Sequence, residues 1–83
     1  MSEERVTIYS ASWCAYCYAV KEYLNKKGIK FTDKDIDIDP TAAGESVKKS
    51  GQRGIPVVDI NGSIIVGFDR DKIDHALKVA HLS

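Results

Sequence analysis

The sequence has no excess of charge of either sign: its 83 residues include 12 lysines and arginines and 12 aspartates and glutamates. A net charge of zero provides no bulk attraction to nucleic acid or anionic lipid, so we expect neither as a partner. Long apolar runs are also missing, and none approaches the roughly 20 residues that a membrane-spanning helix needs. Residues 1–5 are polar and acidic rather than an apolar signal peptide, which predicts a cytoplasmic protein.

The sequence is also poor in cysteine, with only Cys14 and Cys17, three positions apart. A disulfide framework of the secreted type ties distant segments together, whereas this pair could close only a very short loop. A zinc site needs four ligands, and His75 and His81 are the only histidines, so we expect no metal. A CxxC pair with a strand before it and a helix after it indicates redox activity, with inert buried thiols as the alternative.

The surroundings of Cys14 favour its reactive form. Residues 6–9 alternate as a strand. From Cys14 the period changes to helical spacing, which continues to residue 27. A thiol at the N-terminal end of a helix meets backbone N–H groups without an intrahelical acceptor and the positive end of the macrodipole. Both stabilise the thiolate, which is the form that attacks disulfides. We predict that the rest of the chain holds this pair in place and presents a partner disulfide to it.

The first half of the chain predicts a strand, a helix and a second strand. The first strand covers residues 5–9, and the helix ends where Gly28 follows two lysines. Residues 29–36 form a weak strand, with Phe31 pointing inward, because the charged residues 33–35 are poor sheet formers. Such charges discourage intermolecular pairing, which is typical of a strand at the edge of a sheet.

A second helix is predicted over residues 40–50, with Asp39 as its N-cap and Pro40 at its first position. Gly51 then ends it. Gly44 weakens its interior, and its apolar face is thin. We therefore expect a marginal helix whose core-facing residues are Ala42, Ala43 and Val47.

Residues 57–60 and 63–66 flank Asn61-Gly62, a strong signal for a two-residue hairpin, and predict two antiparallel strands. A βαβ crossover makes its two strands parallel, whereas a hairpin adds antiparallel ones. The order of elements therefore predicts a mixed four-stranded sheet with helices on both faces. Asp69 caps a last helix, whose predicted core face consists of Ile73, Ala76, Leu77 and Ala80.

Over about residues 5–80 the chain resembles the glutaredoxin family, within the thioredoxin-like fold. Three motifs carry the resemblance: Cys14-Ala15-Tyr16-Cys17, Gly54-Ile55-Pro56 and Gly67-Phe68-Asp69. Within the family, the chain is most similar to small bacterial glutaredoxin-like proteins and ribonucleotide-reductase-type redoxins. The resemblance implies an α/β fold of the order βαβ–α–ββα, in a single domain over residues 1–83. We expect residues 1–4 to be frayed and the protein to be a monomer.

The resemblance further implies a thiol–disulfide oxidoreductase that reduces protein or glutathione mixed disulfides. In this interpretation Cys14 attacks the substrate disulfide, and Cys17, one helical turn later, resolves the mixed disulfide. Tyr16 lines the groove beside Cys14. A cis bond between Ile55 and Pro56 faces the sulfur and leaves the Ile55 backbone free to pair with an incoming peptide or glutathione. Without the resemblance, Pro56 simply marks the start of a strand.

Two further segments are predicted to bind the carboxylates of glutathione. The resemblance implies that Gly67-Phe68-Asp69 holds its γ-glutamyl end, although Asp69 is also explained as a helix cap. Arg53 could offer a cation to a carboxylate, and the simpler interpretation is a solvated loop charge. No tightly bound cofactor is needed, and glutathione is the expected co-substrate.

The chain departs from the family at positions that concern its electron donor. Ala11 stands where glutathione-using members usually have a lysine, and Trp13 before the first cysteine is typical of thioredoxins. The donor is therefore open between glutathione and a thioredoxin reductase. A different class of function is a scaffold in which paired chains hold an iron–sulfur cluster through Cys14 and glutathione.

Overall fold

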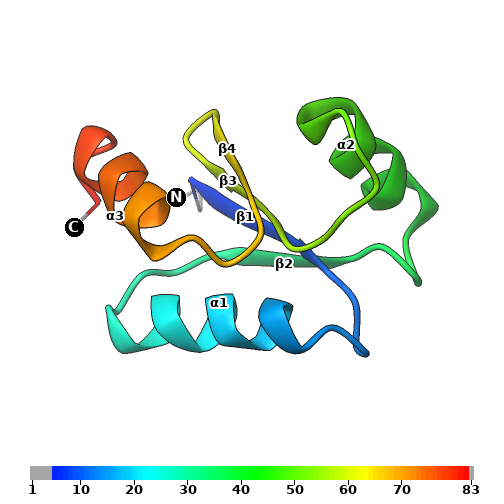
Figure 1. Ribbon diagram of the computed structural model, residues 1–83, viewed down its shortest axis with the longest axis horizontal. Coiled ribbons are helices and arrows are strands. Elements are labelled where there is room, and N and C mark those ends of the chain that lie inside the picture. The colour runs from blue at the N-terminus through cyan, green and yellow to red at the C-terminus, as the bar shows by residue number, and fades with distance from the viewer. Residues whose placement is uncertain (1–4, 83) are drawn as a thin grey trace.

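The computed structural model describes residues 5–82, and its elements follow the predicted order βαβ–α–ββα (Figure 1). The prediction that residues 1–4 are frayed lies outside these residues. In the described part, no helix is long and apolar enough to cross a membrane. The elements are β1 (Val6–Ser10), α1 (Ala15–Lys26), β2 (Thr32–Asp35), α2 (Pro40–Ser50), β3 (Val57–Ile60), β4 (Ser63–Val66) and α3 (Arg70–Val79).

The strands form one mixed sheet in the order β2-β1-β3-β4. β1 pairs in parallel with β2 and antiparallel with β3, and β3 pairs antiparallel with β4. The predicted mixed sheet is confirmed, and the charged strand β2 lies at an edge. The predicted length of β2, residues 29–36, is wrong. The Ile29 N–H donates to the carbonyl oxygen of Leu24 at 3.0 Å, so it closes the end of α1 instead of pairing with β1.

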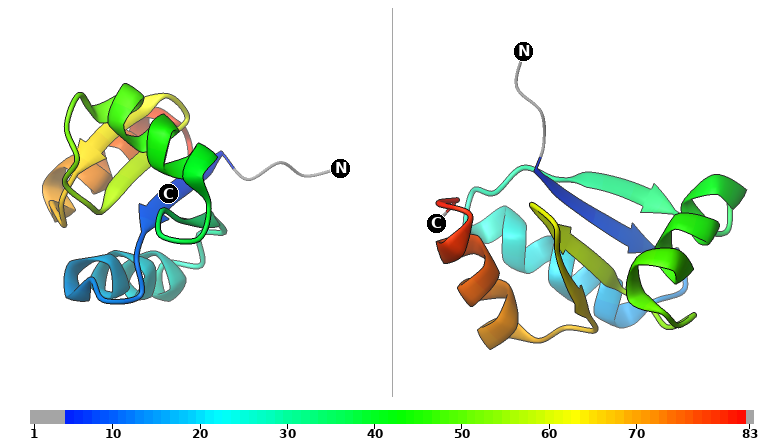
Figure 2. Two further views of the ribbon diagram at one scale, coloured as in Figure 1. Left: turned by 90° about the vertical axis from the view of Figure 1, so that its right-hand side faces the viewer. Right: turned by 90° about the horizontal axis from the view of Figure 1, so that it is seen from above.

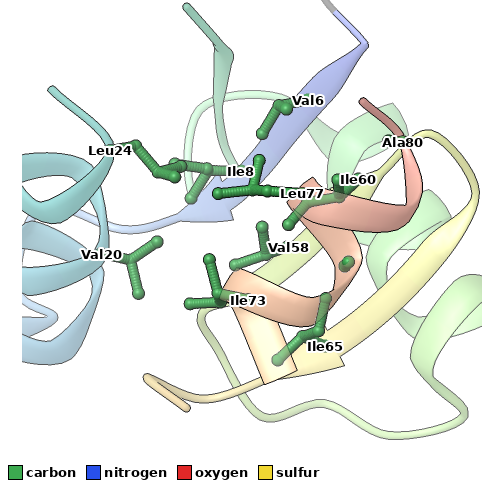
Figure 3. Close-up of a cluster of buried hydrophobic side chains, with 11 residues drawn as sticks. Val6, Ile8, Val20, Leu24, Val58, Ile60, Ile65, Ile73, Leu77 and Ala80 are labelled. Carbon is green, nitrogen blue, oxygen red and sulfur yellow. The ribbon is translucent and has the colours of Figure 1, made fainter. Parts of the chain in front are cut away.

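Helices cover both faces of the sheet, with α1 and α3 on one face and α2 on the other (Figures 1 and 2). The main core lies between the sheet, α1 and α3 (Figure 3). Phe31 packs against its side. The predicted core face of α3 is confirmed, because all four of its residues are buried. Burying one large aliphatic side chain contributes about 1.5–3 kcal/mol, so this layer dominates the stability of the domain. Its buried members include Ile8, Val20, Leu24, Val58, Ile73 and Leu77.

The β3–β4 hairpin forms as predicted around Asn61 and Gly62, which have φ angles of 52° and 97°. Two positive φ values define the type I′ turn, whose twist matches that of the flanking strands. The hairpin places Val57 opposite Val66. It therefore brings the segment before β3 beside the segment after β4, and both segments belong to the predicted site.

The boundaries of α2 are those predicted from its end signals. The Asp39 carboxylate accepts hydrogen bonds from the backbone N–H groups of Thr41 and Ala42, and Gly51 ends the helix with a φ of 73°. The predicted core face of α2 is partly wrong. Ala42 and Ser46 are buried, whereas Val47 is 41% exposed. The helix rests on the sheet through its 42/46 row, because these two residues are one turn apart.

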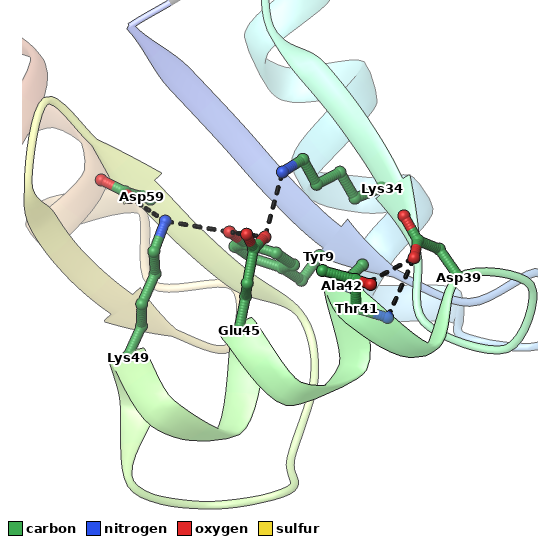
Figure 4. Close-up of polar contacts among 8 residues, drawn as sticks. All are labelled: Tyr9, Lys34, Asp39, Thr41, Ala42, Glu45, Lys49 and Asp59. Atoms are coloured by element: carbon green, nitrogen blue, oxygen red, sulfur yellow. Dashed lines mark hydrogen bonds and ion pairs between the residues drawn. The ribbon is translucent and has the colours of Figure 1, made fainter.

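Polar contacts with Tyr9, whose ring is buried in the sheet, compensate for this small apolar face (Figure 4). The Tyr9 hydroxyl donates to Glu45 at 3.1 Å and accepts from Lys49 at 2.9 Å. Lys34 donates to Glu45 at 3.0 Å, and Lys49 donates to Asp59 at 2.6 Å. These hydrogen bonds lower the pKa of Glu45 and raise the pKa values of Lys34 and Lys49. The charged network therefore attaches α2 to three strands.

This network predicts an acid-dependent loss of stability. Because folding lowers the pKa of Glu45, its carboxylate stabilises the folded protein above the ordinary glutamate pKa of about 4.3. That contribution disappears as the pH falls through the lower folded-state pKa. We expect Glu45→Gln to be less stable than the wild type at neutral pH. We also expect its free energy of unfolding to fall less steeply between about pH 5 and pH 3.

Urea unfolding at a series of pH values measures both effects. Glu22→Gln is the control for removing a surface carboxylate, because Glu22 pairs with exposed Lys26 on the same helix. Identical pH slopes for the wild type and Glu45→Gln would contradict the role assigned to this network.

Candidate active site

Cys14 and Cys17 lie at the start of α1 and are joined by a disulfide, with their Cα atoms 5.3 Å apart. Cys14 is the N-cap residue, and its sulfur accepts a hydrogen bond from the Cys17 backbone N–H at 3.2 Å. The helix therefore begins at Ala15, directly after Cys14, which agrees with the predicted place of this thiol at the N-terminal end of the helix.

The two sulfurs have different surroundings. Cys14 is 7% exposed, whereas Cys17 is fully buried. When the bond is reduced, a negative charge on Cys14 would face the Cys17 N–H and the positive end of the α1 dipole. Both favour the thiolate. An incoming disulfide can therefore reach Cys14 first, while Cys17 stays within bonding distance behind it.

Apolar residues surround the disulfide inside the protein. Ala11, Ile36 and Ile55 pack against the two cysteines, and Ala11 is buried. The carbonyl oxygen of Ala11 accepts a hydrogen bond from the Cys14 N–H at 3.1 Å. The position where the resemblance leads one to expect a lysine in glutathione-using proteins is thus occupied by a small buried residue, and no cation from this position lies beside Cys14.

The three motifs predicted to form the site come together at this end of the sheet. Ile55 packs against the cysteines, and the peptide bond between Ile55 and Pro56 is cis, as the resemblance implied. The Gly67 N–H donates to the carbonyl oxygen of Pro56 at 2.8 Å. The second and third motifs are therefore directly hydrogen-bonded, although they are separated in the chain by the hairpin.

The remaining predicted site residues differ in exposure. Phe68 packs on the main core with its ring edge-on to Tyr23, at a centroid distance of 5.7 Å. Asp69 caps α3 by accepting from the Lys72 N–H at 3.2 Å, which confirms its structural role. Tyr16 and Arg53 are both exposed. The binding roles of these four residues stay predictions.

One contact beside the cysteines is not predicted by the sequence pattern. The indole N–H of Trp13 donates to Asp37 at 2.7 Å, and the Trp13 side chain is 69% exposed. Asp37 belongs to a segment that looks like a run of solvated charges in the sequence. Asp33 in the same segment is also bound, because it accepts from Ser10 at 2.7 Å and pairs with Lys21 at 2.7 Å. In the sequence, only the tryptophan directly before the first cysteine points to this contact.

Metal ligands do not converge in the described part of the chain, where no group of three or more histidine, cysteine, aspartate or glutamate residues could hold an ion. His75 and His81 are exposed.

Comparison with known proteins gives the family. The model of the glutaredoxin family matches residues 6–65. The chain belongs to the glutaredoxin family. An uncharacterized glutaredoxin-like 8.6 kDa protein in the rubredoxin operon of Clostridium pasteurianum is 40% identical over 73 residues. That match covers 88% of this chain and 97% of the relative. Membership and the CxxC pair support the class of thiol–disulfide oxidoreductases.

Solved structures agree with this assignment. A glutaredoxin from Archaeoglobus fulgidus superposes with a TM-score of 0.83 at 22% identity, over 90% of this chain and 87% of that one. This likeness shows the thioredoxin-like fold. The NrdH-redoxin from Escherichia coli, a glutaredoxin-like protein with a thioredoxin-like activity profile, has a TM-score of 0.76 and 32% identity. Its match covers 86% of this glutaredoxin and 92% of the redoxin.

Proposed function

We propose that this glutaredoxin reduces disulfides with Cys14 as the attacking thiol and Cys17 as the resolving thiol. The Cys14 thiolate attacks one substrate sulfur, and the other substrate sulfur leaves as a thiolate that takes up a proton. Cys17 then loses its proton and attacks Cys14. This step releases the second substrate thiol and forms the Cys14–Cys17 disulfide. Two electrons pass to the substrate, and a donor must return them.

One observation supports this assignment of roles. The Cys14 sulfur accepts the hydrogen bond from the Cys17 backbone N–H, and Cys14 is also the more exposed of the two cysteines. A hydrogen-bonded, accessible sulfur suits attack, and a fully buried sulfur suits resolution. Around Cys14 we propose a groove for protein disulfides or glutathione mixed disulfides. Its walls would be the predicted binding residues Tyr16, Arg53, Ile55, Pro56, Gly67, Phe68 and Asp69.

The electron donor is the finer part of the proposal. Glutathione is the donor that family membership suggests, and it would act as a co-substrate without a tightly bound cofactor. The surroundings of Ala11 favour the second candidate, a thioredoxin reductase, because no lysine stands there to bind a glutathione carboxylate. The likeness to the NrdH-redoxin, with its thioredoxin-like activity profile, supports the same candidate. We place the reaction in the cytoplasm, in a single domain over residues 1–83.

A disulfide-reduction assay with separate donors tests this proposal. NADPH consumption is followed with a small dialkyl disulfide as substrate, either with thioredoxin reductase or with glutathione and glutathione reductase. We expect turnover with thioredoxin reductase and slower turnover with glutathione. The reverse order would reject the choice of donor, and no turnover with either would reject the function. A redox potential of about −270 mV, the value of thioredoxin, would support thioredoxin reductase as the donor. A potential of about −200 to −230 mV, the range of glutaredoxins, would support glutathione.

A further inference from the structure

A groove lies beside the disulfide, between α2 and the segments before and after it. Its volume is about 570 Å³. It shares Arg53 with the binding residues proposed above, and its other lining residues have no role in the thiol exchange. It is lined by Ile36, Ala43, Gly44, Ser46, Val47, Lys48 and Arg53.

Ile36 joins this groove to the active site. Its side chain packs against the apolar residues around Cys14 and Cys17 and also against the cluster under α2. Its backbone N–H donates to the carbonyl oxygen of Ser10 at 2.9 Å, which holds it next to the end of β1. Ile36 therefore lines the groove and also packs against the cluster that contains the cysteines, so one substrate segment could reach both.

The groove combines an apolar floor with a basic rim. Val47 is 41% exposed there, and Lys48 and Arg53 are exposed at the rim. No carboxylate is among the lining residues, and within residues 5–82 neither cation forms an ion pair. Lys49, by contrast, is paired with Asp59 at 2.6 Å. In a chain of zero net charge, these two cations give the groove a local positive charge that would attract carboxylates.

Gly44 lines the groove without a side chain, and it lowers the stability of α2. It lies in the interior of α2, where glycine is less favourable than alanine. A Cβ atom added at Gly44 would meet no heavy atom within 4 Å, so no contact inside the protein requires glycine. The bare surface at this position is thus available to a partner.

We propose that this groove binds a segment of the protein substrate that lies close to its disulfide and combines an apolar side chain with acidic residues. The apolar side chain would lie on Ile36 and Val47, and the carboxylates would face Lys48 and Arg53. This inference rests on the proposed function and names its substrate class. The groove thereby selects among protein disulfides, while Cys14 carries out the exchange.

Two matched peptide disulfides test the proposal. They differ only in whether the residues next to a leucine near the disulfide are acidic or basic, and a small dialkyl disulfide serves as reference substrate. For the wild type we expect kcat/KM for the acidic peptide to be about threefold to tenfold higher, as one or two exposed ion pairs allow. This preference should shrink as the salt concentration rises.

Variants in α2 then locate the preference. Lys48→Glu should reduce or reverse it, whereas Lys30→Glu, with the same change in net charge beyond the far end of α1, should keep it. Gly44→Trp should fill the groove and lower the ratio of peptide to small-disulfide reduction. Gly44→Ala should keep that ratio and raise the urea midpoint.

Equal rates for the two peptides in the wild type, or an unchanged preference in Lys48→Glu, would overturn the groove proposal alone. Failure of the wild type to reduce the small disulfide with any donor would instead overturn the proposed function on which it rests.

Discussion

Cys14→Ser is expected to lower the rate of disulfide reduction by roughly a thousandfold or more, because it removes the only nucleophile that a substrate can reach. Cys17→Ser is expected to stop the reaction one step later. Its Cys14 still attacks, but no second thiol is present to release the substrate, so a mixed disulfide accumulates. Turnover with the donors described above and intact-protein mass spectrometry with a cysteine-containing peptide disulfide distinguish the two outcomes.

The two serine variants are matched controls for each other, because both remove one sulfur from the same helical turn. The orientation of the site accounts for their different behaviour: Cys14 is 7% exposed and Cys17 is fully buried. A peptide adduct on Cys14→Ser, or full activity in Cys14→Ser with none in Cys17→Ser, would reverse the assigned roles.

Leu77→Ala is expected to lower the free energy of unfolding by about 2–5 kcal/mol. Leu77 is fully buried where α3 packs on the sheet, together with Val58 and Ile73 (Figure 3). The loss combines the transfer energy of the removed carbons with the cavity that they leave. A domain of this size has a small total stability, so the variant would be partly unfolded at moderate urea concentrations. Urea unfolding followed by circular dichroism measures the change.

Val79→Ala is the matched control in the same helix. Val79 is 61% exposed, so its truncation should change the free energy of unfolding by no more than about 0.5 kcal/mol. Losses of equal size in the two variants would contradict the packing of α3 described above.

The parts of this fold that the sequence predicted correctly depend on short-range rules. Asp39, Pro40 and Gly51 act within one turn of the ends of α2, and Asn61-Gly62 determines its turn by the φ angles that it tolerates. The core face of α3 follows from helical spacing alone. The position of the cysteine pair at the start of α1 belongs to the same group, because it follows from the spacing of neighbouring residues.

The errors have causes that lie beyond these local rules. α2 presents Ala42 and Ser46 to the sheet rather than Val47, because Tyr9, distant in the sequence, binds the neighbouring Glu45 and Lys49. β2 is shorter than predicted because the Ile29 N–H closes the end of α1 instead of pairing with β1.

By itself, then, the sequence determined the order of elements, the family and the presence of a CxxC pair at the start of a helix, since each depends on neighbours in the chain. Only the tertiary structure decided which sulfur is accessible, what surrounds Ala11, and that Ile36 and Arg53 meet α2 in one groove. These features arise where distant segments pack together. Their geometry depends on how the sheet aligns those segments, and no local pattern of residues records it.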